Sequence, residues 1–401
     1  MRILQINAVY GVGSTGMIVK DIHELALENG IESYVAYSTS NLSAAKIKNG
    51  YVIGGTLGKK VHALFCRING KQAYFSSNAT KKLIKHIECI SPNVVHLHNL
   101  HSNYVNLNLL LKYLSKSEIK VVATLHDCWF YTGGCFHYTA AGCDRWLNGC
   151  GMCPKKRADT PAILFDKSKS ILNDRKKYFG AVKNLTFVGV SEWITNEAKK
   201  SLVPAERYVT VYNGVDTKYF APTDSDLRKT LGLEDKFVVL AVANKWMLDV
   251  NSETFKTVAS GLDDESVILM IGCSEEQKRN LPKNVVTMDY IRDKELLKKV
   301  YSMADVFVNC TREESFSLAN VEPQSCGTPT ITYRNTGAKE TVDNVNSFSV
   351  ETGNATALLD RINEIKKNGK NKYSHGCREF VLKKFDKDTN YKKLLDLYYS
   401  L

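Results

Sequence analysis

The sequence predicts an α/β protein made of two doubly wound domains, each built around a parallel sheet. The chain has 401 residues, more than one ordinary hydrophobic core accommodates. Short apolar runs alternate with helical patterns from end to end, and the alternation starts again near residue 236, after a turn-rich segment at 213–226. Two successive β-α-β-α series of this kind are typical of two Rossmann-like domains.

The first series begins with an apolar run at 2–6, where we expect a strand. The glycine-rich turn GVGSTG (11–16) and a helical pattern follow it, and a second strand is expected at 32–37. Three continuous β-rich runs come next, as expected for parallel strands covered on both faces: 93–98, 120–126 and 185–190.

The second series predicts five strands around helical patterns such as 294–304, and these strands lie at 236–243, 266–272, 284–288, 304–309 and 328–333. We therefore expect a first domain at 1–214, with a cysteine-rich insertion at 128–154, and a second domain at 215–385. The last segment, 386–401, is an amphipathic helix expected to cross back to the first domain.

The net charge of +12 comes from dispersed cations without an aromatic-interleaved basic motif, so we expect no nucleic-acid partner. Two basic clusters, at 167–177 and at 366–372, are either solvated helix faces or a surface that rests on anionic lipid. No apolar run is long enough to cross a bilayer, and the N-terminus predicts a strand rather than a signal peptide. We expect a cytoplasmic protein with reduced cysteines, in peripheral contact at most with the inner face of the plasma membrane.

The most specific stretch is TREESFSLANVEPQSCGTPTITY (311–333), in which Glu314 and Glu322 are eight positions apart. A helix that begins near Ser317 would leave Glu314 in the loop at its N-terminus and turn Glu322 toward the same crevice. The free N–H groups and partial positive charge of a helix N-terminus suit a phosphate.

The ordered motifs resemble the retaining glycosyltransferases of family 4, which have the two-domain GT-B fold with a cleft between the domains. The resemblance covers nearly the whole chain and rests on motifs in this order: ILQINAVYGVGSTG, VVHLHNLH, ATLHDCW through GCGMCP, VGVSEWI, YNGVD and the glutamate pair with CGTPTITY. Their order and spacing fit bacterial enzymes that build capsular or exopolysaccharide repeat units.

In the second domain, the resemblance implies that Glu314 lies near the donor sugar, with Glu313 as a substitute, and that Glu322 holds the ribose hydroxyls of the nucleotide. The alternative for either glutamate is an exposed side chain that favours the first turn of a helix. The other expected donor-binding residues are Lys245, Ser317, Leu318, Asn320 and, in the first domain, Gly13.

Gly13 belongs to the GVGSTG turn, which is either a phosphate loop or a tight strand-to-helix turn. Its glycines do not have the spacing of the dinucleotide fingerprint, and we expect no helix-packing glycine after it. His126 ends a predicted strand, and the resemblance places it beside the transferred sugar as a catalytic residue, with Asp127 orienting it; the alternative is a histidine that only caps the next turn.

His98 and His101 are the expected acceptor-binding residues, because the resemblance directs this strand end toward the acceptor. His96 and His98 alternate on a predicted strand and should share one face. A metal site there would need a third ligand.

The insertion contains five cysteines, and its last four are spaced by seven, six and two residues: Cys135, Cys143, Cys150 and Cys153. The final CxxC pair is typical of a zinc knuckle, whereas the other two spacings between cysteines fit no standard zinc-finger motif. A structural zinc and a set of buried thiols therefore both stay open, and disulfides are disfavoured in the cytoplasm. We interpret the stretch as a local staple.

One segment departs from the family pattern. Asp249 and Val250 stand where an Arg and a Lys usually clamp the donor diphosphate, and Lys245, Arg312 or Lys339 would have to replace those cations. A weakened relative that acts as a sugar- or nucleotide-binding or regulatory subunit therefore stays open, as does a cysteine-dependent metal or redox protein.

The leading hypothesis is transfer of a sugar from a UDP- or GDP-sugar to a polyprenyl-linked or polysaccharide acceptor, with retention of the anomeric configuration. Helix N-termini and basic side chains would stabilise the leaving group without a catalytic metal ion. No protein nucleophile is evident in the sequence, which favours same-face attack assisted by the departing phosphate.

Overall fold

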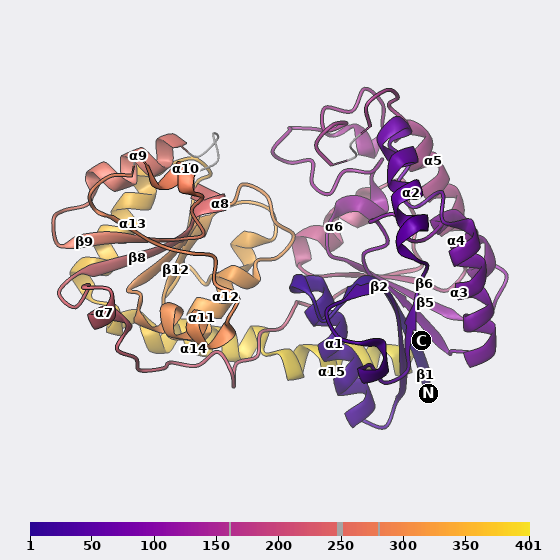
Figure 1. Cartoon of the computed structure of the whole chain (residues 1–401), viewed down its shortest axis with the longest axis horizontal. Coiled ribbons are helices and arrows are strands. Elements are labelled where there is room, and N and C mark those ends of the chain that lie inside the picture. Colours follow the sequence, from indigo (N-terminus) through magenta and orange to yellow (C-terminus); the bar gives the residue numbers. More distant parts are fainter. Residues whose placement is uncertain (160–161, 247–251, 280) are drawn as a thin grey trace. The chain divides into compact units, whose positions relative to one another are not determined.

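The structure is a computed structural model that describes residues 1–401 except 160–161, 247–251 and 280. The chain forms two compact units. Unit 1 contains Met1–Asn213 and Tyr391–Leu401, and unit 2 contains Gly214–Asn390. The chain thus leaves unit 1 at the start of the turn-rich segment and returns to it within its last helix (Figure 1).

Unit 1 is built on a seven-stranded parallel sheet in the order β3-β2-β1-β4-β5-β6-β7. Its strands are β1 (Arg2–Tyr10), β2 (Glu32–Ser40), β3 (Gly50–Val52), β4 (Val94–Leu97), β5 (Lys120–Leu125), β6 (Leu185–Gly189) and β7 (Arg207–Thr210). The predicted strands are confirmed. The two edge strands, β3 and β7, were not predicted, because each is too short and too exposed to carry an apolar run.

Helices cover both faces of this sheet. They are α1 (Gly13–Glu28), α2 (Thr56–Asn69), α3 (Ser77–Ile90), α4 (Leu107–Leu114), α5 (Ser168–Gly180), α6 (Glu192–Lys200) and the end of α15 (Lys387–Ser400), with short 3-10 turns η1 (Ala44–Lys46), η2 (Cys128–Tyr131) and η3 (Arg145–Leu147). α1 and the end of α15 pack on one face, and α3, α4 and α5 pack on the other (Figure 1). The apolar runs of the central strands are fully buried between these layers.

Unit 2 has a six-stranded parallel sheet in the order β10-β9-β8-β11-β12-β13. The strands are β8 (Phe237–Val242), β9 (Ser266–Ile271), β10 (Val285–Met288), β11 (Val306–Asn309), β12 (Thr330–Tyr333) and β13 (Phe348–Val350). All but the last were predicted, and β13 has only three residues. The doubly wound α/β class is therefore confirmed in both units.

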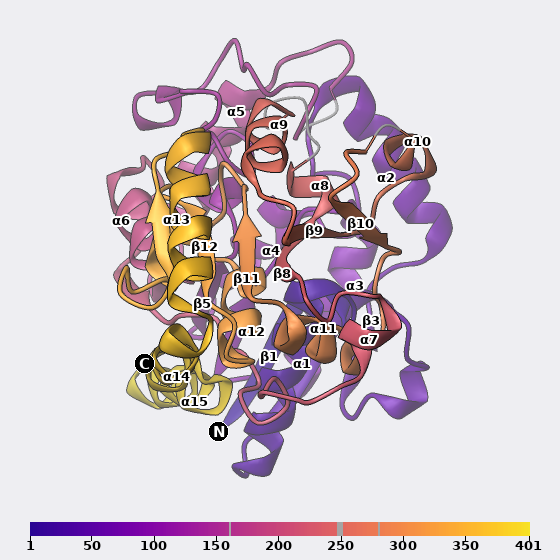
Figure 2. The same ribbon diagram turned by 90° about the vertical axis from the view of Figure 1, so that its left-hand side faces the viewer.

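The helices of unit 2 also form two layers, as Figure 2 shows from the side of this unit. They are α7 (Leu227–Thr230), α8 (Ala243–Trp246), α9 (Ser252–Gly261), α10 (Glu275–Lys278), α11 (Lys294–Met303), α12 (Leu318–Ser325), α13 (Ala355–Asn368) and α14 (Asn371–Phe385), with the 3-10 turn η5 (Ala338–Thr341). α9 and α13 lie side by side and bury Val258, Leu358 and Ile362 against the sheet. None of the described helices is both long and apolar enough to span a lipid bilayer.

Candidate functional site

The order of the strands identifies one candidate ligand-binding position in each unit. The order of the first sheet reverses between β1 and β4, whose carboxyl ends lead to Gly13 and His98. The order of the second sheet reverses between β8 and β11, whose carboxyl ends lead to Trp246 and Glu314. Open α/β sheets bind ligands at such switch points, so four residues singled out in the sequence lie where binding is expected.

Asn309, the last residue of β11, organises the donor-side loop of unit 2. Its buried amide nitrogen donates to Asn320 Oδ1 at 2.7 Å and to Ser317 Oγ at 3.2 Å. Its carbonyl oxygen accepts from the N–H and the hydroxyl of Thr311 at 3.0 and 2.6 Å. This one side chain therefore ties the strand end, the loop and the start of α12 together. Sequence reasoning missed it, although a polar residue that ends an apolar strand is a signal of such a role.

The backbone of Glu314 is held in that loop by two hydrogen bonds. Its N–H donates to Thr336 Oγ1 at 2.9 Å, and its carbonyl accepts from the N–H of Gly337 at 2.9 Å. The carboxylate lies 3.4 Å from the amide nitrogen of Asn309. The loop therefore places a half-buried carboxylate beside the N-terminus of α12.

Glu322 lies on α12, which begins at Leu318 with Ser317 as its N-cap, as predicted. The hydroxyl of Tyr301 donates to Glu322 Oε2 at 3.0 Å. Burial raises the pKa of Glu322 to about 7, although the Tyr301 hydrogen bond and the charge of Lys294 act in the opposite direction. The free carboxyl group is thus poised between its two protonation states near neutral pH.

Three further residues were expected to contact the donor, and the structure gives them different roles. The Asn320 side chain is buried, and its nitrogen donates to Thr341 Oγ1 at 2.9 Å, so it supports the loop instead of facing a ligand. Ser317 accepts from Asn309 and is likewise buried. Leu318 opens the helix, and its backbone N–H has no acceptor within α12, which leaves it suited to an anion.

Trp246 ends α8, is fully buried, and donates from Nε1 to the carbonyl of Val308 at 3.0 Å. It anchors the segment after β8 to β11. Lys245 precedes it on α8, but its side chain is outside the described part, and Asp249 and Val250 lie outside the described residues. The two other candidate cations are half-buried Arg312, in the loop after β11, and exposed Lys339, on η5.

In unit 1, a chain of hydrogen bonds ends at His126. Gln5 donates from Nε2 to the carbonyl of Val19 at 3.3 Å, so its Oε1 faces His98 Nε2, 3.1 Å away. An amide oxygen only accepts, so His98 must donate from Nε2 and accept at Nδ1. His98 Nδ1 lies 3.0 Å from His126 Nε2, which must then carry the proton.

Both of these histidines are neutral. Burial, with the nearby His96 and His126, lowers the pKa of His98 well below its usual range, and burial lowers the pKa of His126 to about 4. Within the described residues, His126 Nδ1 has no hydrogen-bond partner, so it presents a lone pair at the carboxyl end of β5. That atom can accept a hydrogen bond from a sugar hydroxyl.

The prediction that Asp127 orients His126 is wrong. Asp127 accepts from His101 Nε2 at 3.2 Å and from the N–H of Trp129 at 2.8 Å, while the hydrogen-bonding partner of His126 is His98. Burial acts to raise the pKa of Asp127, but the hydrogen bonds from His101 and Trp129 outweigh it, and the pKa falls below its usual value. Asp127 is also the N-cap of η2, so it links His101, in the loop after β4, to the start of the insertion.

His96 is satisfied within the fold. Its Nδ1 lies 2.6 Å from the hydroxyl of Tyr398 on α15, and its Nε2 lies 2.7 Å from Thr124 Oγ1. The ring centroids of His96 and His98 are 3.9 Å apart, which confirms that they share a face. His96 is therefore a structural residue that holds the last helix against unit 1.

Gly13 is the first residue of α1 and has a φ of 63°, a left-handed conformation that favours glycine. A Cβ built there meets nothing within 4 Å, so the turn is open on that side. The last glycine of the turn lies close to the preceding strand. A Cβ on Gly16 would lie 3.0 Å from Val9 Cγ2 and 3.3 Å from the Gly11 nitrogen, so a larger residue would force these neighbours to shift by a few tenths of an ångström.

The last four cysteines of the insertion line one small cavity of about 20 Å³, together with Trp146 and Arg145. A Cβ on Gly133 would lie 2.8 Å from Cys150 Sγ, so this glycine is needed for the packing. Burial raises the pKa of Cys135 to about 12 and that of Cys150 to about 11.

The cavity has room for a single ion or water, but the thiols do not form a ligand set. Within the described ranges, no group of three or more His, Cys, Asp or Glu side chains is arranged to hold a metal ion. All eleven cysteines are free thiols. The donor type suits zinc and the observed arrangement does not, so the structural zinc stays a prediction.

Two family models match the chain. The model described as Glycosyltransferase Family 4 matches residues 18–219, and the model described as Glycosyl transferases group 1 matches residues 234–380. They cover the two units in turn. A protein of Escherichia coli (strain K12) named WcaC, described as a colanic acid biosynthesis glycosyl transferase, is 24% identical over 354 residues, which are 85% of each chain.

Solved structures share the fold over the whole chain. A glycosyltransferase from Rickettsia africae ESF-5 has a TM-score of 0.69 at 16% identity, covering 100% of this chain and 98% of its own. Anabaena Alr3699/HepE in complex with UDP and glucose has a TM-score of 0.66 at 16% identity, covering 100% of both chains. The two parallel-sheet units thus form the GT-B fold.

Proposed function

Because this chain belongs to glycosyltransferase family 4, we propose that it transfers a sugar from a nucleotide diphosphate sugar to an acceptor hydroxyl, with retention of configuration. The observation that carries the proposal is the arrangement around α12, where Glu314 precedes the helix N-terminus and Glu322 lies about one turn into the helix. The donor is assigned to unit 2 and the acceptor to unit 1.

Unit 2 offers the groups that such a donor requires. The N–H groups at the start of α12 meet the diphosphate, and Glu322 accepts hydrogen bonds from the ribose hydroxyls. Glu314 lies near the sugar, held by Thr336 and Gly337. A solved neighbour binds UDP and glucose, which supports a UDP-sugar as the first donor to test.

The reaction we propose proceeds on one face of the sugar. The bond between the anomeric carbon and the diphosphate oxygen breaks, the acceptor hydroxyl oxygen forms the new bond on that face, and its proton passes to the departing phosphate oxygen. Arg312 and Lys339 are the described candidate cations for the leaving group. His126 accepts a hydrogen bond from a sugar hydroxyl at Nδ1 and remains neutral throughout, because burial lowers its pKa.

The acceptor we propose is lipid-linked or polysaccharide, in surface polysaccharide biosynthesis. The relative from Escherichia coli carries the name of one such pathway, colanic acid biosynthesis, and aligns over 85% of its length. The location we propose is cytoplasmic, at the inner face of the plasma membrane.

A second candidate is a catalytically weakened relative that binds a nucleotide sugar without transferring it. The sequence favours it at one place, where Asp249 and Val250 replace two expected cations. It predicts donor binding without turnover, whereas the leading proposal predicts both.

The test is a screen of UDP- and GDP-sugars by thermal shift, followed by product analysis with lipid-linked acceptors. A donor that raises the melting temperature should also be consumed, and the product linkage gives the stereochemistry. Glu322→Gln should abolish the shift, while the matched control Glu276→Gln, an exposed residue of α10, should keep it. Failure of every nucleotide sugar to bind the folded protein would overturn the proposal.

A further inference from the structure

One long segment of unit 1 contains no acidic residue. Between Glu32 and Glu88, residues 33–87 include nine Lys and Arg and neither Asp nor Glu. This segment therefore contributes nine of the twelve net positive charges of the chain. It forms the end of the sheet at β2 and β3 together with α2 and most of α3, so the charge is concentrated on one part of the unit.

The same segment exposes an apolar helix face. α2 buries His62 and Cys66 on one side and exposes five apolar side chains on the other, at spacings of one helical stripe: Leu57, Val61, Leu64, Phe65 and Ile68. Leu57 and Leu64 are 76% and 59% exposed. A stripe of this length on a helix without acidic residues is unusual for a surface that faces only water.

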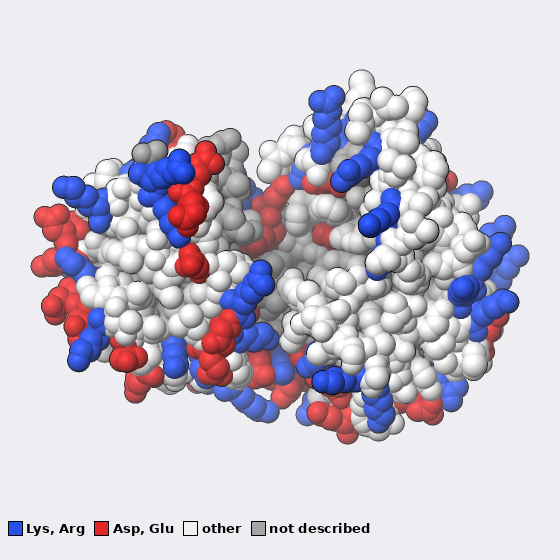
Figure 3. Space-filling view, viewed as in Figure 1, with Lys and Arg blue, Asp and Glu red and all other residues white. Residues whose placement is uncertain are grey.

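A second apolar segment extends this face at the far end of α2. The N–H groups of Ile163 and Leu164 donate to the carbonyls of Arg67 and Ile68 at 2.7 and 3.3 Å. Ile163, Leu164 and Phe165 are all more than half exposed. We call these eight apolar residues of α2 and 163–165 the α2 surface. Figure 3 shows unit 1 in this region as mainly uncharged atoms with scattered Lys and Arg.

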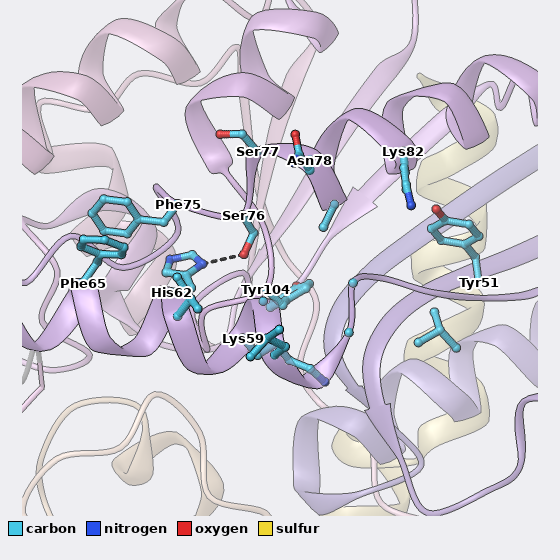
Figure 4. Close-up of a pocket in the computed structure, with 17 residues that line it drawn as sticks. Tyr51, Lys59, His62, Phe65, Phe75, Ser76, Ser77, Asn78, Lys82 and Tyr104 are labelled. Atoms are coloured by element: carbon cyan, nitrogen blue, oxygen red, sulfur yellow. Dashed lines mark hydrogen bonds between the residues drawn. The ribbon is translucent and has the colours of Figure 1, made fainter.

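A cavity of about 840 Å³ opens beside the N-terminal half of α2 (Figure 4). Leu57, Val61 and Phe65 of the α2 surface line it on one side. Its other side is formed by the start of α3, where four polar residues stand beside Phe75 and Ala79: Ser76, Ser77, Asn78 and Lys82. The cavity therefore joins an apolar wall, continuous with the α2 surface, to a wall that suits a phosphate-bearing headgroup.

The two basic clusters noted in the sequence are poorer candidates for lipid contact. Lys366 pairs with Asp263 at 2.6 Å and Glu265 at 3.3 Å. Lys370 is half-buried and donates to the carbonyl of Ser302 at 2.6 Å. In the other cluster, Arg175 lies buried 3.9 Å above the ring of Trp129. On the α2 side, by contrast, Lys60 and Arg67 are exposed next to the apolar stripe.

We propose that the α2 surface docks on an anionic phospholipid bilayer, with its apolar side chains at the depth of the headgroups and one lipid headgroup in the adjoining cavity. The charge of the acid-free segment selects the anionic lipid, and the stripe supplies the apolar contact. The inference deepens the proposed function, because a lipid-linked acceptor would lie in such a bilayer.

The test is flotation of the full chain with vesicles of phosphatidylcholine alone or mixed with phosphatidylglycerol. Binding should require phosphatidylglycerol and weaken as salt is raised. The double variant Leu57→Glu/Leu64→Glu should lower the bound fraction at least about tenfold, because both side chains are largely exposed and their loss leaves the core intact. The matched control Val345→Glu, 69% exposed in unit 2, should bind like the native chain.

Equal binding of the double variant and the native chain would overturn the proposal, as would equal binding to both vesicle types. A native dimer that the double variant converts to a monomer, without vesicle binding by either, would assign the surface to a second copy of the chain and overturn it too. The donor thermal shift, measured on the same samples, separates the two ideas. Vesicle binding without any donor shift would contradict the proposed function and leave the docking surface standing.

Discussion

His126 Nε2 lies 3.0 Å from His98 Nδ1, and the proton between them belongs to His126. The direction follows from Gln5, whose side-chain oxygen can only accept from the other nitrogen of His98. The consequence reaches the candidate site, because His126 Nδ1 is left with its lone pair. A buried glutamine in the first strand thus sets the tautomer of a histidine after the fifth.

Replacing Gln5 by leucine should therefore impair transfer without impairing donor binding. Leucine keeps the volume and removes the acceptor, so His98 and His126 can exchange tautomers. We expect the turnover number to fall about tenfold and the donor dissociation constant to stay unchanged. The fall should be smaller than for loss of His126, because Gln5 acts on His126 only through His98.

His126→Ala should lower turnover at least about a hundredfold. His375→Gln, an exposed histidine of α14, is the control. Steady-state kinetics and calorimetric titration of the donor give the two readouts. Unchanged turnover in Gln5→Leu would show that the hydrogen-bond chain is only structural.

Donor affinity should depend on pH through Glu322. Its pKa of about 7 means that the carboxyl gains its charge as pH rises through neutrality, and the charged form accepts the stronger hydrogen bonds from ribose. We expect the dissociation constant to fall between pH 6 and pH 8 in calorimetric titration. Glu322→Gln should bind weakly at both pH values, so a steep pH dependence in that variant would assign the effect to another group.

The same raised pKa has a consequence for stability. The folded state keeps the Glu322 proton above the ordinary carboxyl pKa of 4.5, so this group makes folding less favourable as pH rises from there through about 7. Glu322→Gln removes the effect. Urea unfolding should show that the variant gains stability relative to the native chain at pH 8 compared with pH 5. An equal difference at both pH values would contradict the assigned pKa.

Asn309→Ala should destabilise unit 2 and disable the donor loop. The substitution leaves buried groups of Asn320, Ser317 and Thr311 without a partner, which costs about 2–3 kcal/mol in the free energy of unfolding. Chemical denaturation measures the loss, and thermal shift should show no donor response. Asn335→Ala is the milder comparison, because it removes only the hydrogen bond to the carbonyl of Thr311 and the one from the hydroxyl of Thr336.

If the cysteine cavity holds zinc, the purified protein should contain one zinc per chain, released by a chelator with a fall in melting temperature. Zinc would require thiolates, and burial raises the pKa of these thiols, so binding would release protons. Cys150→Ser should lose the metal, and Cys89→Ser, an exposed thiol on α3, should not. A zinc-free protein with unchanged stability after chelation would leave the four residues as packed thiols.

Local patterns predicted most of the sheet interiors. Continuous apolar runs identified β4, β5, β6, β8, β9 and β11, because strands covered on both faces must be apolar throughout. The edge strands β3 and β7 escaped notice, because three or four partly exposed residues carry no such signature. β13 is buried, but its three residues are too few to form an apolar run. The glutamate motif located the start of α12 within one residue.

Sequence alone determined the order of strands and helices, the motif order that marks the family, and the acid-free segment, because each is a property of neighbouring residues. Tertiary structure decided the partners: His98 for His126, His101 for Asp127, and Tyr398 for His96 across 302 positions. It also decided that Asn320 supports a loop and that the apolar stripe of α2 stays uncovered within unit 1. Hydrogen bonds and burial depend on which residues, distant in the sequence, come into contact when the sheet forms. The periodicity of apolar residues along the chain does not specify those contacts.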